Sequence, residues 1–255
     1  MRPLILVTND DSGSAPGIKS LINFMKEIGD VVVVAPTTPQ SGMAHSITVR
    51  HPLRLYKIKT EKNHLEYHCS GTPVDCVKLA LDKILKRKPD LLVSGINHGS
   101  NASINVIYSG TVSAAIEGAI MSIPSIAFSV LEYSHDIDFE PYKKFILNIV
   151  KNVLNNGLPE RICLNVNIPF IKASEIKGIK ACRQAIGYWA EEFEKRTDPS
   201  HMDYYWIKGI YKNCDAGKDT DEWALKNNYI SIVPITTDFT MHNAIQNIKN
   251  WNLNV

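Results

Sequence analysis

The sequence predicts an α/β fold, in which a mostly parallel β-sheet is covered by helices on both faces. Residues 4–7 (LILV) are apolar in succession rather than in alternation, which is typical of a strand buried on both faces. A strand, a helix and a second strand occupy residues 4–35, the length of one right-handed βαβ unit. Further short apolar runs alternate with helical patterns as far as residue 166.

The composition excludes several classes of protein. The chain has 255 residues, of which 44% are hydrophobic and 21% charged, and its formal net charge is +2. This balance gives no support for a polymeric nucleic acid partner, and no apolar run is long enough to cross a membrane. The five cysteines are odd in number and form no CxxC pair, which is typical of reduced thiols. We therefore expect a cytoplasmic protein with neither a membrane nor polymeric nucleic acid as its partner.

The first half of the sheet follows from three patterns. Residues 17–28 place apolar side chains at helical spacing, and residues 31–35 (VVVVA) predict the second strand. The GxGxxG motif of dinucleotide-binding proteins is missing from the first turn, so we do not expect NAD. A loop rich in Pro, Thr, Gln and Ser follows at residues 36–45, and partial alternation over residues 47–58 predicts an added hairpin.

The second half of the core begins with a well-marked helix at residues 70–85. Thr72 is a favoured N-cap and Pro73 a favoured first helical residue. A buried strand at residues 90–94 (DLLVS) leads into a polar loop, and the next helix is expected to begin near Thr111. The remaining core elements are predicted as a strand at residues 125–130, a helix at 139–154 and a strand at 162–166.

Residues 171–255 are expected to form a C-terminal extension with a long β-hairpin. Its arms are predicted at residues 176–189 and 204–211, joined by a charged loop. The second arm carries aromatic residues that would be buried more easily against another subunit than in water, which predicts a dimer: Tyr204, Tyr205, Trp206 and Tyr211. A last strand at residues 229–235, interpreted with the hairpin as intersubunit structure, and a short terminal helix at 243–251 complete the chain.

The predicted first strand ends in three polar residues, Asn9, Asp10 and Asp11. The carboxyl ends of strands in open α/β sheets are where ligands bind. Two neighbouring carboxylates repel each other, and a bound cation relieves the repulsion; hard oxygen ligands favour Mg²⁺, Mn²⁺ or Ca²⁺. An ordinary turn is an equally good interpretation of the Asp dipeptide alone.

Two further loops are expected at the same edge of the sheet. Ser41 follows the second strand, Asn97 follows the strand at residues 90–94, and Gly110 and Thr111 begin a helix. An amide oxygen suits the same cation, while free backbone N–H groups at a helix N-terminus bind phosphate. Taken alone, Ser41 fits a solvated loop and Asn97 fits an Asx turn. The convergence of three strand ends is the stronger argument, and it predicts a phosphate site beside a cation.

These residues lie in motifs through which the chain resembles the SurE family of survival-protein nucleotidases. The motifs are VTNDD with APG, QSG, GTPVDCV, SGINHGSN, YSGTVSAAIEG and DTDEWAL. The resemblance implies a Rossmann-like core at residues 1–170. It also implies that residues 171–255 are exchanged between the subunits of a homodimer, which in some members pairs into a tetramer.

The resemblance further implies a phosphatase with one divalent cation per subunit, acting on nucleoside 5′-monophosphates. Further substrates in the family are 3′-nucleotides and short polyphosphate. The implied metal ligands are Asp10, Asp11, Ser41 and Asn97, and the implied phosphate-binding residues are Asn101, Ser109, Gly110 and Thr111. Ser12 and Ser14 stand where the family usually has a glycine and a histidine.

The resulting mechanistic hypothesis assigns the cation to a phosphoryl oxygen and the amides around Gly110 and Thr111 to the charge that develops on the others. The nucleophile is either metal-bound water or Asp10 itself, and Asn9 would orient either one. We expect Asp10 to lie nearest the phosphorus and Asp11 to be chiefly a metal ligand, because successive side chains at a strand end point in different directions. The alternative is a nucleotide-binding or metal-binding module without catalytic activity.

Overall fold

The computed structural model describes residues 2–134 and 136–252. Within these residues the strands are β1 (Leu4–Thr8), β2 (Asp30–Pro36), β3 (Leu55–Glu61), β4 (His64–Cys69), β5 (Leu91–His98), β6 (Ser125–Val130), β7 (Ile162–Ile168), β8 (Gly178–Ala181), β9 (Gly187–Thr197), β10 (Asp203–Asn213) and β11 (Tyr229–Thr236). The helices are α1 (Pro16–Lys26), α2 (Pro73–Leu79), α3 (Gly110–Ile120), α4 (Lys143–Asn156), α5 (Asp221–Lys226) and α6 (His242–Lys249), with the short helices η1 (Ala80–Ile84), η2 (Ser103–Ile107) and η3 (Glu140–Tyr142). In this part of the chain, no helix has the length and apolar character needed to span a membrane.

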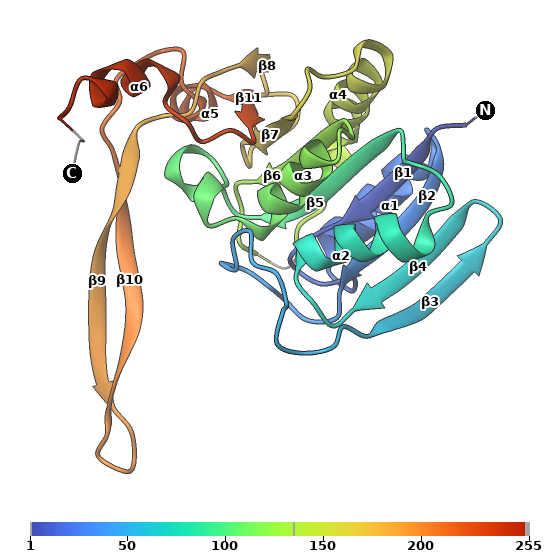
Figure 1. Ribbon diagram of the computed structural model, residues 1–255, viewed down its shortest axis with the longest axis horizontal. Helices are drawn as coiled ribbons and strands as arrows, with labels where there is room; N and C mark the ends of the chain where they lie inside the picture. Colours follow the sequence, from blue (N-terminus) through green and yellow to red (C-terminus); the bar gives the residue numbers. More distant parts are fainter. Residues whose placement is uncertain (1, 135, 253–255) are drawn as a thin grey trace.

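The predicted α/β architecture is confirmed. Nine strands of the described chain form one sheet in the order β3-β4-β2-β1-β5-β6-β7-β11-β8 (Figure 1). Six of these strands are parallel to one another, and β3, β11 and β8 are antiparallel to them. The three strands expected to carry the site, β2, β1 and β5, are immediate neighbours in this order. Their carboxyl ends therefore lie side by side at one edge of the sheet.

Helices cover both faces of the sheet, as the unbroken apolar runs in the strands predict. On one face, α1 and α4 pack against alternate residues of β1 and β2, including Ile5 and Val7. On the other face, α2 and α3 pack against the residues in between, such as Leu6 and Val32. Each of these strands is thus buried from both sides, which explains why its sequence shows no polar alternation.

Several predicted boundaries were wrong. The added hairpin is formed by β3 and β4, whereas residues 47–54 form a loop rather than a strand. The strand expected at residues 90–94 continues to His98, so Asn97 lies in β5 and pairs with Ser129 instead of opening a loop. The helix expected over residues 70–85 is α2 followed by η1, and it begins at Pro73 with Thr72 as its N-cap, as predicted.

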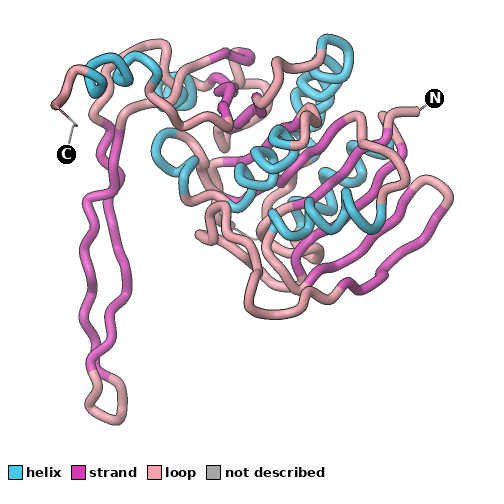
Figure 2. Tube along the Cα trace, viewed as in Figure 1, coloured by secondary structure: helices cyan, strands magenta, loops and turns pink. Residues whose placement is uncertain are grey.

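The arms of the long hairpin were also placed incorrectly. The observed arms are β9 and β10, which pair in register from Gly187 with Asn213 to Thr197 with Asp203. Most of the charged residues predicted as the connecting loop, those up to Arg196, belong to β9, and Figure 2 shows strand continuing almost to the tip. The pair projects from the body as a two-stranded ribbon with both faces in solvent, so charged and aromatic side chains share it (Figure 1).

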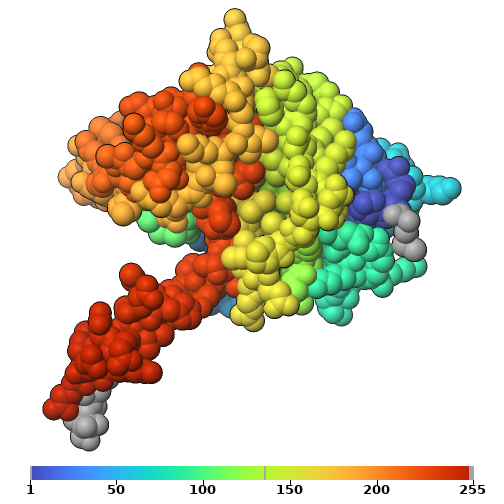
Figure 3. Space-filling model, turned by 90° about the horizontal axis from the view of Figure 1, so that it is seen from above, coloured from blue at the N-terminus to red at the C-terminus, as the bar shows by residue number. Residues whose placement is uncertain are grey.

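The segment after residue 170 is only partly an extension. β11 lies between β7 and β8 in the main sheet, with its antiparallel register running from Ser231 opposite Asn167. The last strand is thus part of the main sheet, and its role between subunits stays a prediction. By contrast, α6 has no buried residue, and the C-terminal segment that carries it extends away from the body in Figure 3. The exchange of residues 171–255 between subunits stays a prediction.

Candidate active site

Asp10 is the second residue after β1 and is almost completely buried, with 3% of its surface exposed. The hydroxyl of Thr111 donates a short hydrogen bond to Asp10 Oδ1, so the first turn of α3 is joined to the end of β1. Gly110 packs so closely that a Cβ added there would lie 2.9 Å from Asp10 Cβ. A glycine is therefore required for this approach between the helix and the carboxylate.

The environment of Asp10 makes its ionised form less favourable than that of an exposed aspartate. Burial, and then the charge of Asp11, raise the pKa of Asp10 from 3.8 to about 6, although hydrogen bonds from the Thr111 hydroxyl and backbone N–H oppose the shift. Asp11 is half-buried and accepts a hydrogen bond of 3.4 Å from the backbone N–H of His98 on β5. Two carboxylates thus meet where β1 and β5 end, and a positive charge between them would relieve their repulsion.

The turn after the carboxylates has an unusual backbone. Ser12 has a φ of +87°, in the left-handed region that favours glycine. The side-chain amide of Asn9 donates to the Ser12 carbonyl at 2.8 Å and holds the turn. The Oδ1 atom of Asn9 is buried, and no group in the described part of the chain donates a hydrogen bond to it. Asn9 therefore stabilises the turn through its side-chain nitrogen, while its Oδ1 atom remains available to accept a hydrogen bond.

Asn97 is oriented by its neighbours in a way that suits a ligand to a cation. Its side-chain nitrogen donates to the carbonyl oxygens of Gly99, at 3.0 Å, and His98, at 3.3 Å. The planar amide consequently turns its oxygen to the opposite side. Asn97 is 9% exposed and lines the cavity at this edge of the sheet.

Ser41 is exposed, but the loop that carries it is anchored at both ends of residues 40–45. The backbone N–H of Gln40 donates to the Asp10 carbonyl at 2.7 Å, and that of Ala44 donates to the Tyr108 carbonyl at 3.2 Å. His45 Nε2 lies 3.0 Å from Oε2 of Glu117, a buried residue of α3. The position of Ser41 is therefore fixed relative to both β1 and α3.

Glu117 has a second partner, which makes it a bridge between helices. Lys78 of α2 lies 2.6 Å from its other oxygen. Burial alone would raise the pKa of Glu117, yet the hydrogen bonds from His45 and Lys78 outweigh burial and lower the pKa below its ordinary value. The charged carboxylate thus joins the Ser41 loop, α2 and α3.

The GTPVD motif also supports the Ser41 loop. Thr72 and Asp75 form a capping box at the start of α2, with Asp75 accepting from the Thr72 N–H at 3.0 Å. Asp75 also accepts from the backbone N–H of Thr48 at 3.1 Å, and the Thr72 hydroxyl donates to the Ser46 carbonyl at 2.8 Å. The same two side chains therefore cap a helix and hold the returning end of the loop.

A cavity of about 320 Å³ lies where these elements meet. It is lined by Asp10, Ser41, Gly42, Asn97, His98, Gly99, Ser100, Asn101, Asn105, Tyr108, Ser109, Tyr133 and Trp189. Five of the residues predicted for the site are among them: Asp10, Ser41, Asn97, Asn101 and Ser109. The remaining four, Asn9, Asp11, Gly110 and Thr111, do not line the cavity but are next in sequence to a lining residue or to each other. A larger apolar cavity of about 650 Å³ between α3 and β11 contains none of the nine.

Asn101 is held more firmly than a phosphate contact would require. Its side-chain amide donates to Ser129 Oγ at 2.9 Å, and its backbone N–H donates to Asn167 Oδ1 at 2.8 Å. Asn165 in turn donates to the Asn101 carbonyl at 2.8 Å. These buried side chains from β6 and β7 fix the floor of the cavity, and one of them, Ser129, accepts the hydrogen bond from the side-chain amide of Asn101.

Eight residues that line the cavity were not among the predicted site residues, and the larger side chains among them include Asn105, Tyr108, Tyr133 and Trp189. The indole N–H of Trp189, at the base of β9, donates to Asn105 Oδ1 on η2 at 2.7 Å. No local signal reveals this contact, because the two residues are far apart in the chain. The sequence does offer a signal for Tyr108, because it directly precedes Ser109 in the motif YSGTVSAAIEG.

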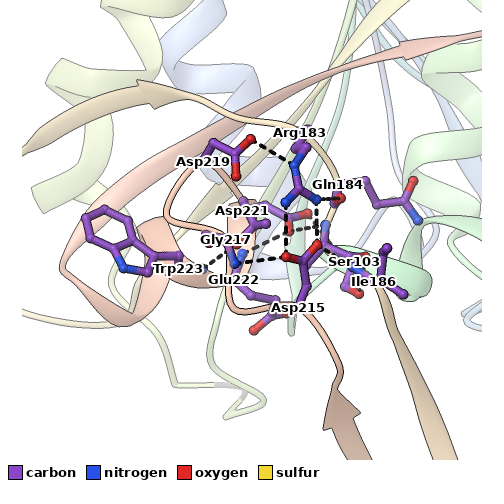
Figure 4. Close-up of polar contacts among 12 residues, drawn as sticks. Ser103, Arg183, Gln184, Ile186, Asp215, Gly217, Asp219, Asp221, Glu222 and Trp223 are labelled. Atoms are coloured by element: carbon purple, nitrogen blue, oxygen red, sulfur yellow. Dashed lines mark hydrogen bonds and ion pairs between the residues drawn. The ribbon is translucent and has the colours of Figure 1, made fainter.

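The DTDEWAL motif connects the cavity to the base of the hairpin (Figure 4). Asp221 accepts hydrogen bonds from the backbone N–H groups of Ser103, at 2.8 Å, and Ala185, at 2.9 Å. Arg183 pairs with Asp219 at 2.9 Å and with Asp215 on the strand side of the same loop. η2, which carries Asn105, is therefore tied to the segment that leads into β9.

Comparisons with known proteins identify the relatives of this chain. Residues 5–191 match the family model described as "Survival protein SurE". The 5′-nucleotidase SurE of Christiangramia forsetii is 60% identical over 255 residues, covering 99% of this chain and 98% of that protein. The 5′-nucleotidase SurE of Flavobacterium psychrophilum is 59% identical over 254 residues and covers 99% of each. The crystal structure of the SurE protein from Aquifex aeolicus superposes with a TM-score of 0.84 at 44% identity, covering 97% of this chain and 98% of that one.

Proposed function

Because this chain belongs to the SurE family, we propose that it is a 5′-nucleotidase, a divalent-metal-dependent phosphatase that hydrolyses nucleoside 5′-monophosphates. The observation that carries the proposal is the cavity at the ends of β1, β2 and β5. There Asp10, Ser41 and Asn97 meet the N-terminal turn of α3. 3′-Nucleotides and short polyphosphate are further proposed substrates.

The side chains at this edge fit a hard divalent cation such as Mg²⁺, Mn²⁺ or Ca²⁺, one per subunit. Asp10, Asp11, Ser41 and Asn97 offer only oxygen atoms, and Asn97 already directs its nitrogen away. Burial, and then the charge of Asp11, raise the pKa of Asp10, and a bound cation would offset both effects. Among the described residues, no cluster of three or more His, Cys, Asp or Glu offers a competing metal site. When bound, the cation would polarise a phosphoryl oxygen of the substrate.

The protein groups have separate roles in the proposed reaction. Asp10 lines the cavity and is held by Thr111, so it is aimed at the phosphorus either as nucleophile or as the base that accepts a proton from water. Asp11 lies behind it and serves chiefly to hold the cation. The positive end of the α3 dipole, at Ser109 and Gly110, stabilises negative charge on the phosphoryl oxygens. Since the Thr111 donors are directed at Asp10, Thr111 acts mainly by positioning that carboxylate.

We also propose that the protein works as a homodimer, with tetramers as a further assembly. The hairpin exposes a set of large apolar side chains: Phe193, Tyr204, Tyr205, Trp206, Ile207 and Ile210. So much exposed apolar surface on a ribbon favours burial against a second copy. Sedimentation equilibrium tests this assembly, and a full-length chain that remains a monomer at micromolar concentration would contradict it.

We propose a cytoplasmic location because the five cysteines are free thiols, four of them buried, which is typical of a reducing compartment.

Phosphate release from a nucleoside 5′-monophosphate tests the proposed activity. With purified protein and added Mn²⁺ we expect steady turnover, and with EDTA we expect none. Binding of the nucleotide without any phosphate release in Mn²⁺, Mg²⁺ or Ca²⁺ would instead support the alternative of a non-catalytic binding module. Equal turnover in EDTA and in Mn²⁺ would contradict the metal dependence while leaving the phosphatase activity standing.

A further inference from the structure

The outer part of the cavity is aromatic, and no role has yet been given to it. Tyr108, Tyr133 and Trp189 line it, and they come from three elements: the end of η2, the loop after β6 and the base of β9. All three remain substantially exposed although they are large apolar side chains. Exposed aromatic residues that converge on one cavity from separate elements are typical of a binding surface.

Trp189 is held in place by several contacts, and the ring of Tyr133 rests on the backbone of Gly99. Trp189 donates its indole N–H to Asn105, makes an edge contact with Tyr211 at 6.0 Å between centroids, and packs against Gly209. The ring of Tyr133 lies directly on Gly99, where an added Cβ would be 2.3 Å from its Cε1 atom. Rings that are fixed before a ligand arrives lose little conformational entropy on binding.

The charges around the cavity point in the same direction. Its lining contains the carboxylate of Asp10 but neither a lysine nor an arginine. The uncharged part of a phosphate ester bound there would therefore be recognised by stacking and hydrogen bonds rather than by ion pairs. Aromatic rings offer such contacts to a flat heterocycle, because every nucleobase has a face that stacks on an aromatic side chain.

We propose that Tyr108, Tyr133 and Trp189 form a nucleobase subsite, in which the base of a nucleoside monophosphate stacks on Tyr133 and Trp189 while its phosphate reaches Asp10. The inference rests on the proposed function, since it assigns the leaving-group side of the same reaction. Asn105 acts as a positioning residue through its hydrogen bond to Trp189. The subsite favours nucleotides over sugar phosphates that lack a base, and it has little preference among bases because stacking is tolerant of sequence.

Variants of the two stacking rings test the subsite. Tyr133→Ala and Trp189→Ala are each compared with the wild type for adenosine 5′-monophosphate and for ribose 5-phosphate. We expect KM for the nucleotide to rise about fivefold to a hundredfold, because the loss of one base–aromatic stack has an effect of that size. KM for ribose 5-phosphate should change by less than about twofold, because that substrate has no base. Trp189→Phe keeps a ring and should retain most of the nucleotide preference.

Tyr188→Ala is the matched control, since Tyr188 is the exposed neighbour of Trp189 on β9 but does not line the cavity. It should behave as the wild type with both substrates. Equal losses for the two substrates in Tyr133→Ala, or no loss for the nucleotide in either alanine variant, would overturn the proposal. If the wild type releases no phosphate from either ester, the proposed function fails. Equilibrium dialysis of the nucleotide against the same variants then still decides whether the subsite exists.

Discussion

Replacing Gly110 by alanine should damage catalysis while leaving the fold intact. The new Cβ would lie 2.9 Å from Asp10 Cβ and 3.0 Å from Asp10 Oδ2, whereas ordinary contacts between carbon atoms begin at about 3.5 Å. The Asp10 carboxylate must therefore move by roughly half an ångström. Since a displacement of about 1 Å at a reacting group costs about a hundredfold in rate, we expect kcat/KM to fall by about tenfold to a hundredfold.

The stability of Gly110→Ala should change much less than its activity. Alanine is favoured over glycine in helices by up to about 1 kcal/mol, which offsets part of an overpacking cost of about 1–3 kcal/mol. Urea unfolding and nucleotide hydrolysis over a range of Mn²⁺ concentrations measure the two effects.

Gly118→Ala on the same helix provides the contrast. Its Cβ would lie 2.3 Å from Ser125 Oγ and 2.9 Å from Leu92 Cδ1, away from the cavity, so it should lower stability without changing the kinetics of the folded protein. A Gly110→Ala enzyme with wild-type kcat/KM and Mn²⁺ dependence would refute the role given to the Asp10 carboxylate.

Three further predictions follow from the same side chains. Asp11→Asn should weaken Mn²⁺ affinity, and high Mn²⁺ should partly restore its activity. Asp10→Asn should instead lower kcat by about a hundredfold or more, and Mn²⁺ should not restore it. Equal rescue of both variants would mean that the two carboxylates are interchangeable ligands. Glu117→Gln removes the charge that joins His45 and Lys78, so the loop carrying Ser41 should loosen. Its Mn²⁺ requirement should rise several-fold and its free energy of unfolding should fall by about 1–3 kcal/mol, and unchanged Mn²⁺ titrations would contradict that coupling. Without a cation, in EDTA, the pKa of Asp10 is raised from 3.8 to about 6 in the folded state. Between pH 3.8 and about pH 6 the folded protein therefore binds more protons than the unfolded chain, so the free energy of unfolding should decrease as the pH rises through this range. The decrease should total about 3 kcal/mol in urea titrations and be absent from Asp10→Asn.

The core was predictable because each of its strands is buried on both faces. Residues 4–7 and 31–35 have no polar face to confuse the pattern, and β1 and β2 appear there with small boundary errors. The hairpin was harder, since β9 and β10 have no covering layer and hence no buried face to mark them. A run such as EEFEKR is then indistinguishable from a loop by composition, although in the structure it is half of a regular ribbon.

The candidate site was predictable to the extent that strand ends define it. Asp10, Ser41 and Asn97 each follow or end a strand of the parallel core, and strand order brings them together. Trp189 could not be found in this way, because its place at the cavity depends on a contact between β9 and η2 that no periodicity encodes. The tie through Asp221 that holds those two elements together is likewise invisible until the fold is known.

The assembly of the site from neighbouring strands has a consequence for the cation. Asp10 is held by α3, Asp11 by the N–H of His98 on β5, and Ser41 by a loop fastened to β1. Ser41 and Asn97 are far from the Asp pair in the chain. An unfolded chain therefore cannot hold the four proposed ligands together. A ligand that binds only the folded state stabilises it in proportion to the logarithm of its concentration. If the proposed ligands bind a divalent cation, adding Mn²⁺ should therefore raise the free energy of unfolding of the whole sheet rather than order a local loop.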